Sequence, residues 1–117
     1  VVSGDGVYLG GTIGPGLRMG LRALHTQTSM LPDVSLEMPD SALGKETVAC
    51  MRAGVIYGVA GAVDRIYAEL AGMVDAQPDL LLTGGDAHLI APLVRTPCRV
   101  VQDLVLSGLA AMYRRMG

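Results

Sequence analysis

The chain has 117 residues, a formal net charge of −2 and an isoelectric point near 5.5, and half of its residues are hydrophobic. This composition excludes a disordered chain and indicates a single domain, residues 1–117, with an aliphatic core, because Phe and Trp are absent. It also contains no run of Lys or Arg, and its uncharged stretch Ala53–Val63 is shorter than the ~20 residues of a membrane span. We therefore expect no nucleic acid and no membrane as partners.

The first thirteen residues predict part of a β-hairpin. Gly4-Asp5-Gly6 is a tight-turn signal, because Asp and Gly tolerate the positive φ of a twisted hairpin turn. The segment Val7–Ile13 after the turn is long enough for a strand, whereas only three residues precede the turn. The chain also does not begin with Met. We therefore expect a fragment whose preceding segment pairs with Val7–Ile13 and is a candidate to hold catalytic groups.

Two helices are predicted in the first two thirds of the chain. Leu17, Leu21 and Leu24 recur at helical spacing and predict a helix from about Pro15 to Thr28, with Pro15 in the first turn. A loop with a short edge strand around Val34 and Leu36 should follow. The longest helix is predicted to begin at Gly44-Lys45-Glu46-Thr47 and to end near Gly72.

Small residues recur four apart on this longest helix, at Gly54, Gly58 and Ala62. Each mid-helix glycine costs ~1 kcal/mol relative to Ala, which suggests that another backbone comes close there. Two interpretations remain open and are compatible: tight packing on the sheet, and a helix–helix contact between subunits.

The last third alternates strands and helices. Leu80–Leu82 is a short apolar run typical of a strand buried on both faces, and Arg99–Val101 is a second strand. Helices are predicted over Asp86–Val94 and Asp103–Arg115, with Asp86 and Asp103 as plausible caps. With the antiparallel hairpin at the start, this order predicts an α/β fold with a mixed sheet and flanking helices.

Two junctions could carry chemistry. Gly84 and Gly85 stand between a strand and a helix, where free backbone N–H groups could contact a nucleotide; a tight turn without a ligand explains them equally well. Lys45 and Thr47 open a helix and could hold a carboxylate, or they could form an ordinary cap.

The remaining reactive residue types form no recognisable site. Cys50 and Cys98 lack metal spacing and are interpreted as buried free thiols of a cytosolic protein. His25 and His88 have no partner at ligand spacing. No nucleophile–histidine–acid set and no acidic dyad can be proposed.

Six motifs, in order and at similar spacing, resemble type III pantothenate kinase, and specifically its C-terminal half. They are Gly10–Leu17, Thr28–Pro32, Leu43–Val48, Gly54–Gly58, Leu82–Gly85 and Asp103–Leu109. Each motif alone is weak, but together they cover essentially the whole chain.

The resemblance implies the C-terminal lobe of the two-lobed, actin-like or ribonuclease H-like kinase fold of the acetate and sugar kinase–Hsp70–actin superfamily. It implies transfer of the γ-phosphate of ATP to pantothenate, the first step of coenzyme A synthesis, in a cytoplasmic homodimer. Mg²⁺ and a monovalent cation, K⁺ or NH₄⁺, are implied as cofactors. Thr47 matches the threonine that contacts pantothenate across the dimer interface, and Gly84 and Gly85 match glycines of the adenosine-binding segment.

The chain also departs from the family pattern. The phosphate loop, the segment with the general-base aspartate, and the strand with the cation ligand all lie in the family's N-terminal half and have no match in this chain. We therefore expect no catalytic residue, no metal ligand and no kinase activity in these 117 residues alone. Asp86 stands where the family pattern has a small or apolar residue. The alternatives to an enzyme part are a non-catalytic regulatory or accessory protein of the same superfamily and a purely structural or dimerisation module.

Overall fold

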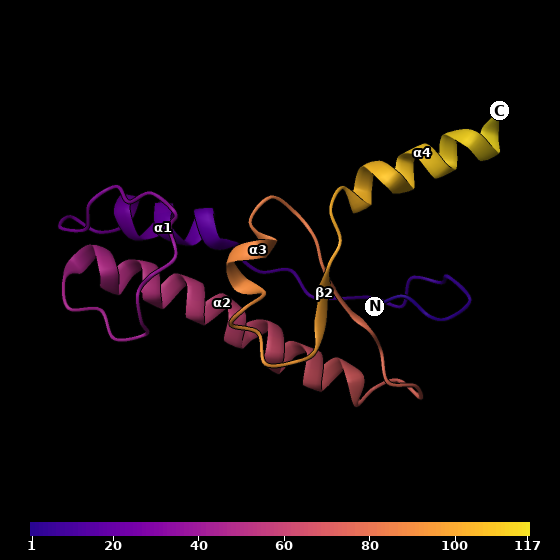
Figure 1. Ribbon diagram of the computed structural model, residues 1–117, viewed down its shortest axis with the longest axis horizontal. Helices are drawn as coiled ribbons and strands as arrows, with labels where there is room; N and C mark the ends of the chain where they lie inside the picture. The colour runs from indigo at the N-terminus through magenta and orange to yellow at the C-terminus, as the bar shows by residue number, and fades with distance from the viewer.

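The computed structural model describes all residues 1–117 and arranges them as four helices and two short strands (Figure 1). In chain order these are α1 (Leu17–Thr26), α2 (Thr47–Ala71), β1 (Leu80–Leu82), α3 (Ala87–Ile90), β2 (Cys98–Val100) and α4 (Leu104–Met116). Apart from the edge strand expected near Val34 and Leu36, the predicted order of helices and strands after residue 15 is confirmed.

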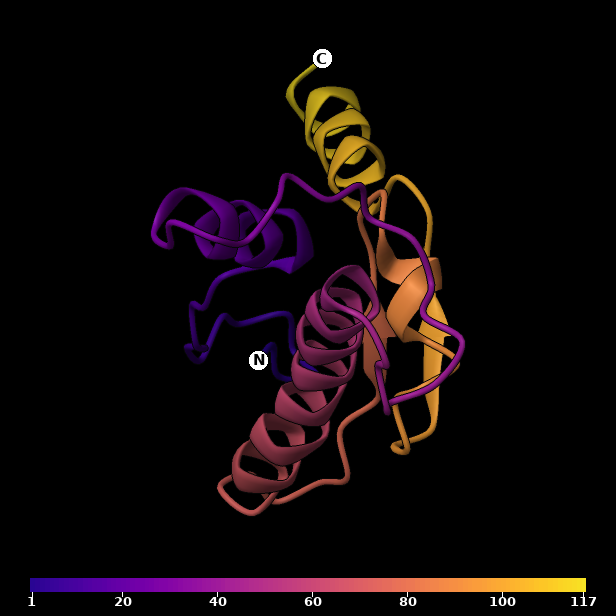
Figure 2. The same cartoon turned by 90° about the vertical axis from the view of Figure 1, so that its left-hand side faces the viewer.

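The long helix α2 is the element on which both α1 and α3 pack. Helix α1 runs along its first half, and the sheet with α3 packs beside it (Figures 1 and 2). Strands β1 and β2 are parallel, with Leu80 opposite Cys98 and Leu82 opposite Val100. Leu80 and Leu82 pack on the core, whereas Leu81 between them is 40% exposed. The prediction that this strand is buried on both faces is therefore wrong for this chain.

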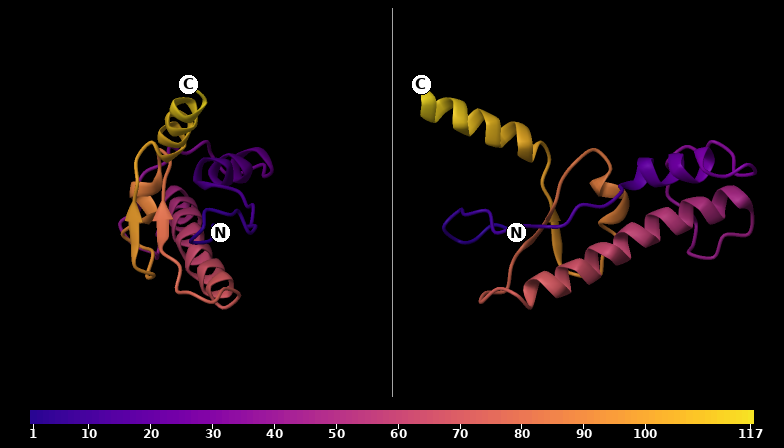
Figure 3. Two further views of the ribbon diagram at one scale, coloured as in Figure 1. Left: turned by 90° about the vertical axis from the view of Figure 1, so that its right-hand side faces the viewer. Right: turned by 180° about the vertical axis from the view of Figure 1, so that it is seen from behind.

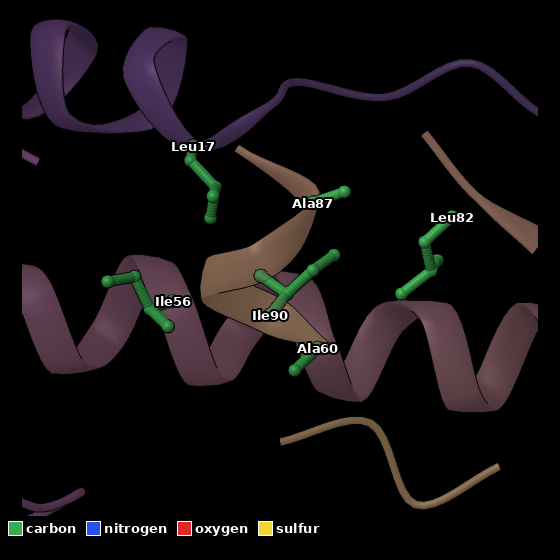
Figure 4. Close-up of a cluster of buried hydrophobic side chains, with 6 residues drawn as sticks. All are labelled: Leu17, Ile56, Ala60, Leu82, Ala87 and Ile90. Atoms are coloured by element: carbon green, nitrogen blue, oxygen red, sulfur yellow. The ribbon is translucent and has the colours of Figure 1, made fainter. Parts of the chain in front are cut away.

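The core lies where α1, α2, β1 and α3 meet (Figure 4). It contains Ile56, which is fully buried, and around it Leu17, Ala60, Leu82, Ala87 and Ile90. These side chains are aliphatic, as the composition predicted. Burial of apolar area of this kind stabilises by roughly 25 cal/mol per Å² and fixes the β1–α3 turn above it.

Helix α2 has 25 residues, and its most apolar stretch has a mean hydropathy of 1.2. By length and composition it could cross a membrane, although its uncharged stretch Ala53–Val63 is shorter than a membrane span. Such a helix is weak support for a span, since core helices have the same properties. Polar contacts also tie α2 to other segments: Arg52 donates to the Ser35 carbonyl and hydroxyl, and Asp64 accepts from Thr96.

The glycines of α2 are not in close contact with the sheet. A Cβ placed on Gly54, Gly58 or Gly61 would meet no atom within 4 Å. Tight packing within this chain therefore does not explain them, and that interpretation is wrong. They leave an open strip along the outer face of α2.

The N-terminal hairpin is short: its pairing ends where Leu9 and Gly10 bond Val1. Gly6 has a φ of 82°, Ser3 accepts from Gly6, and Val2 and Tyr8 form an isolated antiparallel bridge. The strand predicted over Val7–Ile13 is absent, because only Val1 to Ser3 lie beside it. The sheet is consequently parallel and two-stranded, and the predicted mixed sheet is not formed in this chain.

Other boundaries differ by a few residues. The helix predicted over Asp86–Val94 ends at Ile90, because Pro92 has no N–H and disfavours helical conformation in the residue before it. Helix α1 is shorter than predicted at both ends, and β2 and α4 are each displaced by one residue. The edge strand expected near Val34 and Leu36 does not form.

Candidate functional site

The first turn of α2 presents free hydrogen-bond donors. Glu46 precedes the helix in an extended conformation, and its side chain makes no capping bond. The first bond of the helix runs from the Cys50 N–H to the Glu46 carbonyl. The N–H groups of Thr47 and the two residues after it therefore have no backbone partner, and the helix dipole adds positive potential there. This end of α2 is suited to an anionic or strongly polar group.

A hollow of about 550 Å³ opens beside this turn. Its lining combines apolar side chains from α1 and the following loop with the polar start of α2: Leu24, Leu31, Gly44, Lys45, Glu46, Thr47, Cys50 and Met51. Its volume lies within the range of small-molecule sites, but the hollow is shallow and wide open to solvent. Lys45 and Thr47, which the sequence singled out as a possible carboxylate site, thus share one hollow.

Gly44 allows the loop to approach α2 this closely. A Cβ at this position would lie 2.6 Å from the Cys50 Cα and 2.7 Å from the Ala49 carbonyl carbon. Real Cβ atoms do not come so close to backbone atoms, so only glycine fits without a shift. The shape of the hollow therefore depends on this residue.

The second predicted site is the turn between β1 and α3. Gly84 has a φ of 105°, which side-chain-bearing residues rarely adopt, and its carbonyl accepts from the Ala87 N–H. Leu82 and Ala87, on either side of the turn, are both in the core (Figure 4). The exposed glycines, Gly84 and Gly85, are therefore anchored on both sides by buried core residues. Helix α3 has only four residues, so its dipole adds little.

Asp86 does not cap α3. It occupies the capping position, but its side chain makes no capping bond and instead accepts two hydrogen bonds from Arg18, at 2.9 and 3.0 Å. These contacts hold the pKa of the Asp86 carboxyl below its usual value and raise the pKa of Arg18. Asp103 likewise makes no side-chain capping bond. Both predicted caps are wrong as side-chain caps.

The structure does not bring the two predicted sites together. Arg18, at the start of α1, contacts the residue after Gly85, whereas Leu24, near the end of α1, lines the Thr47 hollow. Six residues of helix separate them by about 9 Å along the axis. Within this chain, Thr47 and the Gly84–Gly85 pair do not line a common hollow.

A further polar contact escaped the sequence analysis. Asp64 on α2 accepts from the N–H groups of Arg95 and Thr96 and from the Thr96 hydroxyl, at 2.8 to 3.0 Å. These bonds lower the pKa of Asp64. The partners lie more than thirty residues away, and no local pattern predicts them. They fix the turn that leads into β2.

The cysteines and histidines form no metal site. Cys50 is exposed and Cys98 is half-buried, so the prediction of two buried thiols is wrong. The His25 ring contacts the Leu31 carbonyl at 2.8 Å. No group of three His, Cys, Asp or Glu side chains is placed to hold a metal ion.

Comparison with known proteins decides the family. The sequence model described as type III pantothenate kinase matches residues 1–69. The chain belongs to the type III pantothenate kinase family. The proteins of that name from Anaeromyxobacter sp. (strain K) and Syntrophus aciditrophicus (strain SB) are 42% and 40% identical to it over 115 and 114 residues. The resemblance seen in the sequence motifs is thereby confirmed.

The match covers nearly all of this chain but less than half of each relative. It includes 98% of this chain but 45% of the Anaeromyxobacter protein, and 97% and 44% for the relative from Chlorobaculum parvum. The chain thus spans less than half the length of these type III pantothenate kinases and corresponds to their C-terminal half. Both candidate sites, Thr47 and Gly84–Gly85, lie in this half.

Proposed function

We propose that this chain is the C-terminal part of an enzyme that phosphorylates pantothenate with ATP, the first step of coenzyme A synthesis. One observation carries the proposal. In a chain about 40% identical to named type III pantothenate kinases, the free N–H groups of α2 open into a hollow with Thr47 and Lys45. The actin-like lobe architecture that the resemblance implies is part of the same proposal.

In this proposal the hollow binds pantothenate, a molecule with a carboxylate, polar amide and hydroxyl groups, and an apolar dimethyl centre. Thr47 and the free N–H groups donate hydrogen bonds to its anionic end, and the positive charge of Lys45 offsets the negative charge of Glu46 in the same lining. Leu24 and Leu31 offer apolar contact. The site therefore positions the substrate rather than activating it.

In this proposal the chain also takes part in binding ATP, through the backbone of its glycine turn. Gly84 and Gly85 contact the adenosine of ATP, and the Arg18–Asp86 ion pair links the end of that turn to α1. No group of three His, Cys, Asp or Glu side chains in this chain is placed to hold a metal ion, and we assign no cation ligand to it. We therefore derive no step through a cation here, and we expect no kinase activity from the 117 residues alone.

The test is a steady-state assay on the native protein that contains this chain, measuring pantothenate-dependent ADP release. Thr47→Val should raise the KM for pantothenate about tenfold, as expected for a lost hydrogen bond to a charged group, and leave the KM for ATP unchanged. Thr47→Ser should restore activity, and Thr26→Val, an exposed threonine outside the hollow, is the control. Absence of pantothenate-dependent turnover would favour the non-catalytic accessory alternative.

We also propose that the enzyme is a cytoplasmic homodimer in which α2 meets its counterpart. The open strip at Gly54, Gly58 and Gly61 supports this, since nothing in the chain covers it. The separation of Thr47 from Gly84 and Gly85 also supports it, because a second subunit could supply the missing half of each site. Light scattering should show that Gly58→Arg gives monomers. Ala68→Arg, about 15 Å farther along the helix, should leave the dimer intact.

A further inference from the structure

One part of the Thr47 hollow is built without regular structure. The chain between α1 and α2, residues 28–43, forms no backbone–backbone hydrogen bond. It leaves the end of α1 and returns to the start of α2, and these three parts lie together at one end of the molecule (Figures 1 and 3). Contacts made by side chains must therefore hold whatever residue of this segment lines the hollow.

Leu31 is that residue, and it is half-buried. Both of its backbone polar groups bond to side chains at or just beyond the end of α1. The Leu31 N–H donates to the Thr28 hydroxyl at 3.3 Å, and the Leu31 carbonyl accepts from Nδ1 of the His25 ring at 2.8 Å. A carbonyl oxygen only accepts, so this contact requires a proton on Nδ1 of His25.

The Thr28 hydroxyl also reaches a second apolar residue of the lining. It donates to the Leu24 carbonyl at 2.6 Å while it accepts from the Leu31 N–H. One hydroxyl thus joins the backbones of Leu24 and Leu31, which together we call the leucine wall. The neighbours of Leu31 in the chain give it less support: Met30 is 85% exposed, whereas Pro32 favours extended backbone at Leu31.

We propose that His25 and Thr28 are positioning residues that hold the leucine wall in place, and that the wall makes the hollow select a substrate with a branched apolar centre. The inference rests on the proposed function, in which the hollow binds pantothenate. The polar start of α2 can bind the carboxylate of any similar molecule. The two methyl groups of pantothenate need apolar contact instead, and the leucine wall supplies it.

The size of the selectivity follows from this contact. Full burial of one methyl group changes affinity roughly fourfold. The hollow is shallow, so we expect about a fivefold preference for pantothenate over its analogue that lacks both methyl groups, less than full burial would give. A gap of about 0.5–1 Å already forfeits a quarter to a half of a dispersion contact. A wall that has lost its hydrogen bonds should therefore lose most of the preference.

The test compares pantothenate with this analogue in steady-state assays on the native protein that contains this chain. His25→Phe keeps a ring but has no donor, and Thr28→Val has no hydroxyl. Each should raise the KM for pantothenate about threefold and leave kcat and the KM for the analogue unchanged. His25→Asn, whose amide nitrogen can donate from the place of Nδ1, and Thr28→Ser should restore the KM. The matched control is Thr26→Val, at an exposed threonine outside the hollow.

A second set of variants shows whether the two residues act through the wall. Leu31→Ala should remove the preference directly. His25→Phe added to Leu31→Ala should then change nothing further, because residues that act through one contact are not additive. A double variant that loses as much as the two single variants together would contradict this.

Two results would overturn the inference. One is an unmodified protein with equal KM values for pantothenate and the analogue. The other is a ratio of KM values that His25→Phe and Thr28→Val leave at its original value. A purely structural role would give this second result, because a smaller folded fraction lowers the rate with both substrates by the same factor.

Isothermal titration calorimetry with pantothenate and the analogue separates this inference from the proposed function. If the native protein binds pantothenate without phosphorylating it, the proposed function is wrong, and the dissociation constants of the same variants should still show the expected ratios. If it phosphorylates pantothenate with ratios that the variants leave unchanged, only the inference is wrong. A protein that neither binds nor phosphorylates pantothenate would contradict both.

Discussion

Replacing Gly44 with alanine tests how the Thr47 hollow is built. The new methyl group would meet three backbone atoms at once: the Cys50 nitrogen, the Cys50 Cα at 2.6 Å and the Ala49 carbonyl carbon at 2.7 Å. All three belong to the first turn of α2, which cannot yield as a flexible side chain could. Either the loop before α2 or the first turn of the helix must move.

The expected cost follows from this overlap. Overpacking by a methyl group costs about 1–3 kcal/mol, and a clash with backbone belongs in the upper part of that range. One kcal/mol corresponds to about 4 °C in the melting temperature of a domain of this size, so Gly44→Ala should melt about 8–12 °C lower. Gly54→Ala is the matched control, because its methyl group meets nothing within 4 Å. It should gain up to about 1 kcal/mol from helix propensity.

Thermal and urea unfolding, followed by circular dichroism on dilute chains, would measure both variants. The two substitutions are chemically identical and should have opposite signs. A Gly44→Ala chain as stable as the parent would refute the close approach of the loop to α2. A Gly54→Ala chain that loses as much as Gly44→Ala would refute the open outer face of α2.

Three further predictions concern polar contacts. Because hydrogen bonds lower the folded-state pKa of Asp64, its contribution to stability is present above about pH 4 and is lost as the pH falls through that lowered pKa. Asp64→Asn should therefore lower the melting temperature at pH 7 and flatten its fall in acid, with Thr96→Val as a parallel test; an unchanged acid profile would contradict this. For the exposed Arg18–Asp86 pair, Asp86→Ala should cost no more than about 1 kcal/mol in urea unfolding. A larger loss would mean that the pair supports the glycine turn structurally. Tyr67→Phe removes a 2.8 Å hydrogen bond to a backbone carbonyl and should cost about 0.5–1.5 kcal/mol by the same measurement, whereas a neutral effect would show that water replaces the bond.

The sequence predicted those elements whose burial this chain supplies by itself. The strand Leu80–Leu82 has its predicted bounds, and α2 starts within three residues and ends within one residue of its prediction, because their apolar residues meet partners in the same chain. Two of the failed predictions, the strand over Val7–Ile13 and the burial of Leu81, share one cause. Their apolar patterns are real, but no other segment of the chain covers them.

The candidate sites divide in a similar way. Thr47 and the Gly84–Gly85 pair were predicted from local signals, namely a helix start and a strand-to-helix turn, and their role in binding stays a prediction. The contact between Arg18 and Asp86 joins residues 68 positions apart, and no local signal marks it. Sequence patterns indicate candidate binding residues, whereas the contacts that hold those residues in place appear only in the fold.

The two candidate sites lie on different parts of the chain, and neither includes the exposed helix α4. The Gly84–Gly85 turn rests on the core around Ile56, and the Thr47 hollow is built by α1, α2 and Gly44. Neither site uses α4. Substitutions in α4 should therefore leave the core and both candidate sites in place. Substitutions at Gly44 should reshape the Thr47 hollow and leave the Gly84–Gly85 turn as it is, so the two candidate sites are separable by mutation.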